Sequence, residues 1–253
     1  MNDAIHRVQR YRDTLLDELH CCAKYQKSSK DILIVVHNQL PLLKRCISSV
    51  RRNTDDYKIL LWDNASDCET SDWIKSQPDI MCIRNEKNIG FIKPNNRLAE
   101  LSTADYIVLL NSDTEVIQNW DKAMIAQIQQ HDYAEVGYLG GYLDGNGKGT
   151  SFGFGDKVDY IPAWCACLPR KTYLKYGLFD DKNLIFAYCE DSDFSLRITE
   201  AGDRIYALHL GLCIHYENAT INEVSKIIDC KESYIKNHEY IKIRHKNRLK
   251  TTS

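Results

Sequence analysis

Short apolar segments alternate with helix-like segments through the first half of the chain. Four strands are expected from the runs ILIVV, YKILLWDN, IMCIRN and YIVLL, at residues 32–36, 57–64, 80–85 and 106–110. Helical patterns separate them, at residues 41–52, 70–76 and 95–102, and Pro41 stands in the first turn of the earliest. This alternation predicts a mainly parallel sheet covered by helices on both faces, and therefore the α/β class.

The second half of the chain predicts an extension of the sheet rather than more copies of the same unit. We expect a helix, a hairpin with a Gly-Asn-Gly turn, a strand, two helices and a late strand, at residues 118–130, 138–155, 158–170, 171–177, 193–202 and 204–210. Apolar steps of three and four also predict an amphipathic helix over residues 4–22. The expected organisation is an N-terminal helix, a central domain and a basic helical tail, at residues 1–30, 31–220 and 221–253.

Composition argues against several classes of protein. A formal net charge of −2 offers no global attraction to nucleic acid. The apolar runs are far shorter than the roughly 20 residues that cross a bilayer, and the N-terminus shows no apolar signal core. The 10 cysteines form no CxxC pair and no spacing typical of zinc ligands. We expect a cytoplasmic protein with reduced thiols.

Polar residues follow three of the predicted strands where each ends. His37 and Asn38 follow the first strand, Asp63 and Asn64 end the second, and the stretch from Asn111 to Asp113 follows the fourth. Each set alone is typical of turns and caps. Ligands of open α/β sheets, however, bind outside the carboxyl ends of the strands, where all three sets are expected to converge.

The first turn, VVHNQLPL, contains no glycine, which argues against a dinucleotide fingerprint or a phosphate loop. A nucleotide bound here would have to be held by side chains and a metal ion. Asp63 is suited to accept an N–H of a nucleobase. Asp113 is suited to bind a divalent ion that bridges two phosphates, because such ions prefer hard oxygen ligands.

Two later stretches add candidate residues. In YCEDSDFSLRITEAG, the acids Glu190, Asp191 and Asp193 stand at a helix start, where they could simply cap the helix. The same position favours an ionised carboxylate, which a general base must be. His215, in LCIHYE, is either a structural histidine or a ligand.

Taken in order, these pieces resemble the inverting family 2 glycosyltransferases of the GT-A fold. The resemblance runs from about residue 31 to 217 and is carried by ILIVVHNQLPLLKRCISSV, LLWDNASDCET, NEKNIGFIKPNNRLAELSTADYIVLLNSDTEV, WCACLPRKTYLKYGLFDD and CEDSDFSLRITEAGDRIYAL. It implies a Rossmann-like GT-A domain with helical additions at both ends. The form LNSDTEV resembles branches that include rhamnosyltransferases.

The resemblance also implies roles for individual residues. On the donor side it implies that a nucleotide is bound by Val36, His37, Asp63, Asn88, Lys93, Asn96, Asn111 and Ser112, although Lys93 could equally be a solvated surface lysine. It implies metal ligation by Asp113 and His215. Glu115, two residues beyond Asp113, is a further candidate ligand by position, although the register of the family disfavours it. Trp164 would line the sugar or acceptor site, unless it serves core packing. Glu190 and Asp191 would carry catalysis, with Asp191 as the general base.

Asn111 stands where many relatives have a first aspartate. The resemblance therefore implies a metal site with one carboxylate, Asp113, in which Mn²⁺ or Mg²⁺ is completed by the phosphates of the donor. The donor would be a sugar linked to UDP, dTDP or GDP, and the acceptor a hydroxyl of a glycan, a lipid-linked glycan or a protein. One base suffices for a single displacement with inversion.

Two alternatives stay open at this point. A sugar nucleotidyltransferase shares an α/β nucleotide site with acidic ligands, but it would normally carry a glycine-rich basic turn after the first strand. A non-catalytic nucleotide-sugar-binding module is the second.

The two ends of the chain could mediate further contacts. The basic tail could hold the protein peripherally at the inner face of a membrane, and the N-terminal helix could serve homo-oligomerisation.

Overall fold

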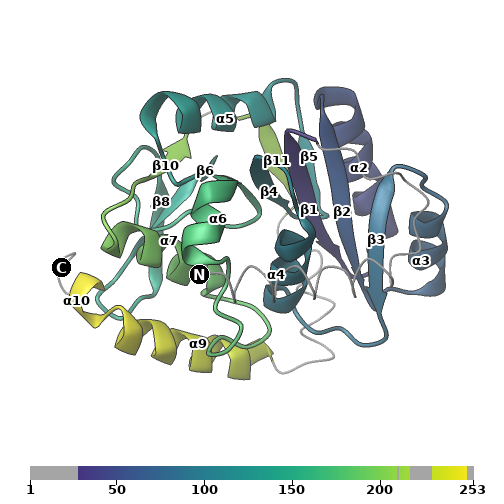
Figure 1. The fold of residues 1–253 in the computed structure, drawn as a ribbon. Helices are drawn as coiled ribbons and strands as arrows, with labels where there is room; N and C mark the ends of the chain where they lie inside the picture. The colour runs from purple at the N-terminus through teal and green to yellow at the C-terminus, as the bar shows by residue number, and fades with distance from the viewer. Residues whose placement is uncertain (1–27, 210, 217–229, 250–253) are drawn as a thin grey trace, which may run out of the picture.

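A seven-stranded sheet with the order β10-β6-β9-β4-β1-β2-β3 forms the centre of the computed structural model, which describes residues 28–209, 211–216 and 230–249 (Figure 1). In one half, β1 (Lys30–Val36) pairs in parallel with β2 (Tyr57–Asn64) and with β4 (Tyr106–Leu110). β3 (Ile80–Asn85) continues this half in parallel beyond β2. The mixed, mainly parallel sheet predicted from the sequence is confirmed.

The other half of the sheet is attached through an antiparallel strand. β9 (Cys165–Pro169) runs antiparallel to β4 on one side and to β6 (Glu135–Tyr138) on the other. β10 (Ile205–Leu208) then pairs in parallel with β6. Two further pairs of strands lie outside this sheet, namely β5 with β11 (Thr114–Val116 and Cys213–His215) and the hairpin β7–β8 (Gly140–Leu143 and Gly149–Gly153).

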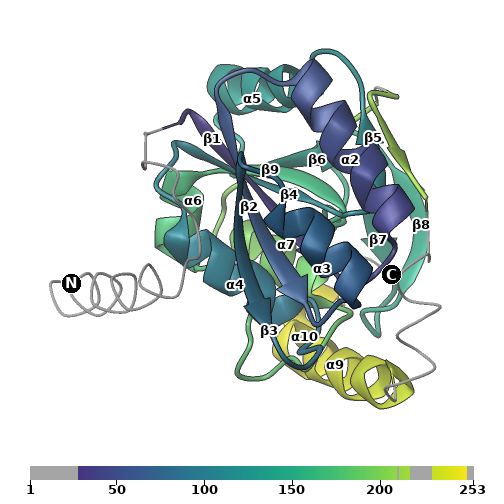
Figure 2. The same ribbon diagram turned by 90° about the vertical axis from the view of Figure 1, so that its right-hand side faces the viewer.

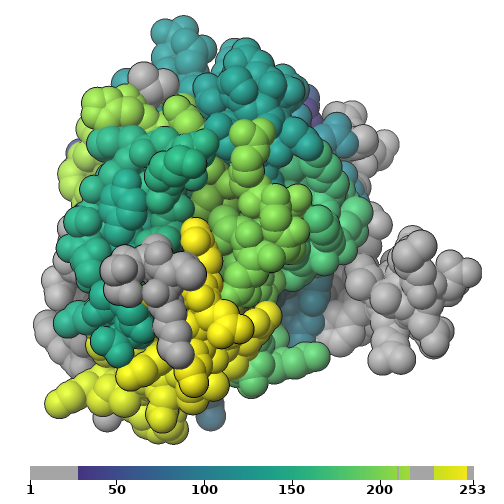
Figure 3. Space-filling view, turned by 90° about the vertical axis from the view of Figure 1, so that its left-hand side faces the viewer, coloured from purple at the N-terminus to yellow at the C-terminus, as the bar shows by residue number. Residues whose placement is uncertain are grey.

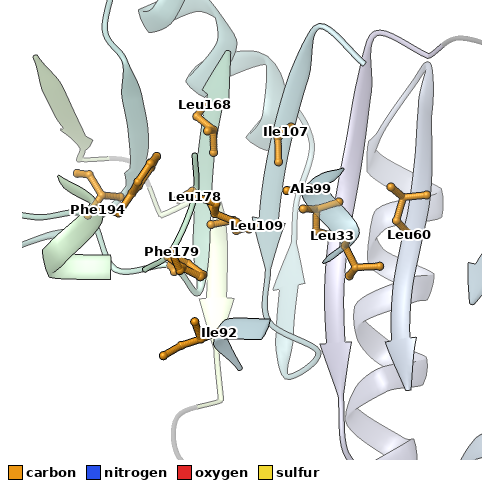
Figure 4. Packing of buried hydrophobic residues seen from close by; sticks show 14 of the residues in the cluster. Leu33, Leu60, Ile92, Ala99, Ile107, Leu109, Leu168, Leu178, Phe179 and Phe194 are labelled. Atoms are coloured by element: carbon orange, nitrogen blue, oxygen red, sulfur yellow. The ribbon is translucent and has the colours of Figure 1, made fainter. Parts of the chain in front are cut away.

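Helices cover both faces of the sheet (Figures 1 and 2). The face with α2, α3 and α5 (Leu40–Asn53, Cys68–Lys75 and Trp120–His131) receives alternate residues of β1, including Ile32 and Ile34. The opposite face packs on α4, α6 and α7 (Ile92–Leu101, Arg170–Tyr176 and Glu190–Glu200), and Leu33 points into it (Figure 4). Because both faces of β1 are covered, its sequence is apolar throughout ILIVV rather than alternating.

The C-terminal helices pack on the domain. α9 (Cys230–Arg244) and α10 (Lys246–Leu249) place Ile241 and Leu249 in a small core shared with Leu143, Cys189 and Leu196. Figure 3 shows these yellow helices set against the teal hairpin and the lime-green region that contains α7. The predicted helical character of the tail is confirmed for residues 230–249, whereas the division of the chain near residue 220 stays a prediction. The predicted N-terminal helix lies outside the described residues.

Most boundaries match the sequence predictions to within three residues, and two differences have clear physical causes. The predicted strand over 158–170 begins only at Cys165, because residues before it serve the hairpin instead. Asp159 accepts the amide of Leu143, and Tyr160 bridges to Gly141. The helix predicted to start at 193 starts at Glu190, so its acids lie inside its first turn. None of the described helices is both long and apolar enough to cross a membrane.

Gly90 brings the segment after β3 against the loop that precedes α7. Its φ is +87°, and a Cβ at this position would lie 2.3 Å from the carbonyl oxygen of Phe186. The amides of Phe91 and Ile92 donate to that same oxygen at 2.7 and 3.3 Å. Only glycine fits a backbone contact this close, so the two segments are fixed to each other here.

Gly90→Ala should therefore lower the free energy of unfolding by more than about 3 kcal/mol, because backbone strain and steric overlap add. Gly155→Ala is the matched control, since Gly155 has a φ of +88° and nothing lies within 4 Å of the added Cβ. Denaturant unfolding of both variants checks the expectation. Equal losses in the two would show that the contact with Phe186 is unimportant.

Candidate active site

A cavity of about 510 Å³ opens at the carboxyl ends of β1, β2 and β4. It continues along the hairpin β7–β8 and the loop before α7, and His238 of α9 closes part of its wall. Nine of the residues proposed from the sequence line it, namely His37, Asn88, Asn111, Ser112, Asp113, Trp164, Glu190, Asp191 and His215. The structure thus brings together residues that are up to 178 positions apart in the chain (215 − 37).

The other four proposed residues lie outside the lining. Val36 is buried in the core beside α2, and its neighbour Val35 lines the cavity instead. Lys93 is exposed. Asn96 donates its amide to the carbonyl of Phe179 at 2.8 Å and accepts the Phe179 N–H at 2.9 Å, so it holds two backbone segments together.

Asp63 is buried beneath the cavity rather than exposed to it, with 1% of its surface accessible. One carboxylate oxygen accepts the amide of Ser66 at 2.9 Å, and the other pairs with the guanidinium of Arg84. Both oxygens are therefore engaged within the protein. This arrangement differs from the predicted contact of Asp63 with a nucleobase. The sequence pattern shows an acid at the end of a strand, but it does not show that Arg84 pairs with that acid.

Asn64 shapes this end of the cavity. Its amide group donates to Asn88 Oδ1 and to the carbonyl of Gly90, both at 2.8 Å, while its oxygen accepts the Ile89 N–H at 2.9 Å. Its backbone carbonyl accepts Nδ1–H of His37 at 2.9 Å. Nε2 of His37 is consequently left as a hydrogen-bond acceptor, buried and without a partner among the described residues.

Asn111, Asp113 and His215 converge at the end of β4. Nε2 of His215 lies 3.2 Å from Oδ1 of Asp113 and 3.2 Å from Nδ2 of Asn111. One ring nitrogen cannot donate to the carboxylate and accept from the amide at the same time. Oδ1 of Asn111 is buried without a partner in the described part of the chain.

These three side chains fit a divalent cation. A cation would relieve the conflict at Nε2, and turning the Asn111 amide over would give its unpartnered oxygen a partner. A carboxylate, an imidazole and an amide oxygen together suit Mn²⁺ or Mg²⁺ completed by ligand oxygens. Within residues 28–209, 211–216 and 230–249, no cluster of three or more His, Cys, Asp or Glu side chains could hold an ion alone.

Neighbouring residues hold His215 and Asn111 in place and engage Glu115 elsewhere. The indole of Trp164 stacks on the imidazole of His215 with ring centroids 5.0 Å apart and an angle of 5° between planes. The carbonyl of Trp164 accepts the Asn111 N–H at 2.9 Å. Glu115, the further candidate ligand, instead pairs with the guanidinium of Arg45 and accepts the hydroxyl of Tyr216 at 3.1 Å.

Glu190 and Asp191 form an acidic pair at the start of α7. Burial, with the neighbouring Asp191 charge second, raises the pKa of Glu190 to about 8. Burial also raises the pKa of Asp191, although its carboxylate accepts the Ser192 N–H at 2.7 Å. At Glu190, burial outweighs the tendency of a helix N-terminus to favour an ionised carboxylate.

Asn237 of α9 is the most informative residue that sequence reasoning missed. It is fully buried, and its amide group donates to the carbonyls of Ile185, Ala187 and Tyr188, each at 2.9 Å, while its oxygen accepts the Ile185 N–H. This loop has positive φ at Phe186, Tyr188 and Cys189, which costs free energy for residues with a side chain. Asn237 thus holds the strained loop that leads into the acidic pair.

Acids and histidines set the charge of the cavity lining. Among the described residues, no lysine or arginine lines it, and its acidic members are Asp113, Glu190 and Asp191. Three histidines, His37, His215 and His238, complete the titratable set. The described lining therefore offers no lysine or arginine to neutralise the negative charge of a phosphorylated ligand.

Comparison with known proteins places this architecture. The family model for glycosyl transferase family 2 matches residues 31–165, which is more than half of the chain. The chain belongs to glycosyltransferase family 2. No curated protein matches it.

Solved structures support the GT-A fold of this family 2 chain. GalNAc-T7 with UDP, GalNAc and Mn²⁺ is 18% identical with a TM-score of 0.62, over 73% of this chain and 43% of that one. The mannosyltransferase PcManGT from Pyrobaculum calidifontis, with GDP-Man and Mn²⁺, is 12% identical with a TM-score of 0.62, over 88% and 67%. S. aureus TarS 1–349 with UDP-GlcNAc is 15% identical with a TM-score of 0.56, over 72% and 56%.

Stability should depend on pH through Glu190. Its pKa of about 8 exceeds the ordinary 4.5, so the folded state retains a proton that the unfolded state has lost between these values. The stabilising contribution of this group is full below the lower value and is lost as the pH rises to about 8, with a slope of at most ~1.4 kcal/mol per pH unit.

Glu190→Gln should therefore become more stable relative to the wild type as the pH is raised through this window. Denaturant unfolding at pH values across it checks the sign. Burial also raises the pKa of Glu135, which lies outside the cavity lining, to about 8. The stability of Glu135→Gln relative to the wild type should therefore rise over the same pH window. A stability difference between wild type and Glu190→Gln that stays constant with pH would contradict the raised pKa.

Proposed function

We propose that this chain is a metal-dependent inverting glycosyltransferase that moves a sugar from a nucleoside-diphosphate sugar to an acceptor hydroxyl. The observation that carries the proposal is that two functional groups line the same cavity. Asn111, Asp113 and His215 form a donor set for a divalent ion, and Asp191 lies in the same cavity as the candidate base. The UDP, GDP-Man, UDP-GlcNAc and Mn²⁺ complexes of similar structures support a ligand of this class.

The charge of the cavity supports the requirement for metal. Cleavage of the donor concentrates negative charge on the departing diphosphate, and that charge must be stabilised. The described lining offers no lysine or arginine for this purpose. When bound, a divalent ion at Asp113 and His215 supplies that stabilisation. Asn88, Asn111 and Ser112 would orient the donor through amide and hydroxyl groups.

The acidic pair supports a single displacement. With a pKa of about 8, Glu190 holds its proton at neutral pH and is a poor nucleophile. Asp191, the intrinsically stronger acid, would accept the proton of the acceptor hydroxyl as that hydroxyl attacks the anomeric carbon. One attack from the face opposite the diphosphate inverts the configuration. The strained loop before α7, held by Asn237, would fix the position of Asp191.

No observation favours the alternative of a sugar nucleotidyltransferase. Such an enzyme must hold a nucleoside triphosphate, which carries more negative charge than a nucleotide sugar. The absence of lysine and arginine from the described lining makes that harder. A non-catalytic binding module would share the nucleotide site, and turnover distinguishes it from an enzyme.

Asp191→Asn should retain the stabilisation by nucleotide and Mn²⁺ but lower the turnover of the nucleotide sugar by about 10²- to 10⁴-fold, because only the proton acceptor is lost. Release of nucleoside diphosphate, in the presence of acceptor glycosides, measures turnover. Asp156→Asn is the control, as Asp156 is exposed and outside the cavity. Substantial remaining turnover in Asp191→Asn would refute the role of the base.

Metal binding should depend on Asp113 and not on an acid at position 111. We expect Mn²⁺ to raise the melting temperature in the presence of UDP, dTDP or GDP, and EDTA to remove the effect. Asp113→Asn should abolish it, whereas Asn111→Asp should keep or strengthen it, because a second carboxylate adds charge beside the ion. An Mn²⁺ effect that survives in Asp113→Asn would place the ion elsewhere.

A further inference from the structure

The cavity has a second half of different chemistry, away from Asn111 and Asp113. Its lining comes from the hairpin β7–β8, from the segment before β9, from the loop before α7 and from α9. The side chains there are mainly aromatic or aliphatic, and they include Leu143, Phe152, Tyr160, Pro162, Phe186 and Tyr188. Glu190 and Asp191, the first two residues of α7, are the only acids of this aromatic half among the described residues.

Phe152 is the least covered ring of this aromatic half. It lines the cavity, yet 63% of its surface is exposed. Across the hairpin it pairs with Gly141, and the ring of Tyr160 occupies the space that a side chain there would need, with Cε1 at 2.1 Å from the position of a Cβ. Two aromatic rings therefore flank one glycine at the mouth of the cavity.

Polar groups accompany these rings. Nδ1 of His238 lies 2.8 Å from the carbonyl of Tyr234 and 3.2 Å from the Cys189 thiol, so both contacts use the same ring nitrogen. Tyr234 in turn contacts the rings of His238 and Tyr188, with centroids 4.0 and 5.7 Å away. The wall combines apolar ring faces with hydroxyl and imidazole groups.

The charge of the aromatic half limits its occupant. Among the described residues it presents carboxyl groups and no lysine or arginine, so a phosphate or carboxylate on the occupant would be repelled. A pyranose has an apolar C–H face and a polar rim, which matches ring faces with polar groups beside them. A lipid phosphate matches the apolar surface but not the charge.

We propose that the aromatic half binds a neutral saccharide as the acceptor, with one pyranose face on Phe152 and a hydroxyl directed at Asp191. The proposal rests on the proposed glycosyltransferase function and names its acceptor class. The residues that would recognise it come from the hairpin β7–β8 and from α9. Leu143 of the hairpin shares a small core with Ile241 of α9 and Leu249 of α10. The acceptor is thus selected by neutral charge and by a stacking face.

The chain offers a matched pair of variants. Phe152 lines the cavity, whereas Phe154, two residues later and 44% exposed, stands edge-on to His209 at 4.1 Å and outside the lining. Phe152→Ala should weaken binding of a neutral saccharide roughly fivefold to tenfold, and Phe154→Ala should change it less than about twofold. Neither side chain is buried in the core, so both variants should fold.

Saturation-transfer NMR measures the binding of each probe to the full chain in the presence of Mg²⁺ and of UDP, dTDP or GDP. The probes are a panel of neutral methyl hexosides and methyl 6-deoxyhexosides, methyl glucuronide as a charged pyranose, and farnesyl phosphate as an anionic lipid. We expect at least one neutral glycoside to bind, with the loss confined to Phe152→Ala, and methyl glucuronide and farnesyl phosphate to bind more weakly.

Three results would overturn the acceptor class, namely preferential binding of methyl glucuronide or farnesyl phosphate, binding of no neutral glycoside, or equal effects of the two phenylalanine variants. A melting-temperature shift with nucleotide and Mn²⁺ is read separately. If that shift is present while neutral glycosides fail to bind, the acceptor assignment is wrong and the glycosyltransferase proposal stands. If no nucleotide produces a shift, the glycosyltransferase proposal itself is wrong.

Discussion

The antiparallel pairing of β9 with β4 is the interaction on which the arrangement of the site depends. Five residue pairs join the two strands, from Tyr106 with Pro169 to Leu110 with Cys165. The next hydrogen bond, from the Asn111 N–H to the Trp164 carbonyl, carries the pairing into the cavity. The end of a parallel strand, with its polar residues, is thereby fastened to the segment that leads toward the acidic pair. These hydrogen bonds therefore fix the position of one half of the sheet, and of the cavity residues it carries, relative to the other half.

The two ends of the cavity differ in their electrostatic character. At the ends of β1, β2 and β4, amides, imidazoles and one ionisable oxygen ligand, Asp113, are present, and a bound cation would fit them. At the start of α7, burial raises the pKa of Glu190 so that the two adjacent acids do not both carry charge at neutral pH. The cavity can therefore place a negative leaving group and a proton acceptor near each other without a large surplus of like charge.

The strands and much of the site could be predicted from sequence because both depend on local patterns. The short apolar run YIVLL, rich in β-branched residues and followed by turn-forming residues, is typical of a buried strand. Acids or amides at its end lie at a sheet edge by topology. Asp63 fits the same pattern, yet it pairs with Arg84. Asn96 stands in α4, where the backbone of Phe179 engages it. Such partners are distant in sequence, and a pattern of residue types along one chain does not identify them.

Asn237 and the loop before α7 show the other limit of sequence reasoning. A single asparagine in a polar helix carries no signal, because its four bonds are made with backbone atoms of Ile185, Ala187 and Tyr188. Positive φ at three non-glycine residues in a row of four is equally invisible, since side chains normally disfavour it. The raised pKa of Glu190 depends on burial that only the packed structure defines.

The dependence of that loop on α9 has a consequence for the order in which the protein becomes complete. During synthesis the N-terminal strands emerge first and can pair early, since β1 contacts β2 after only 20 intervening residues (57 − 36 − 1). The loop from Ile185 to Cys189 emerges later, and its brace, Asn237, later still. A nascent chain can thus hold a nearly finished sheet while its acidic pair is still unpositioned, and the emergence of α9 determines when that pair becomes fixed.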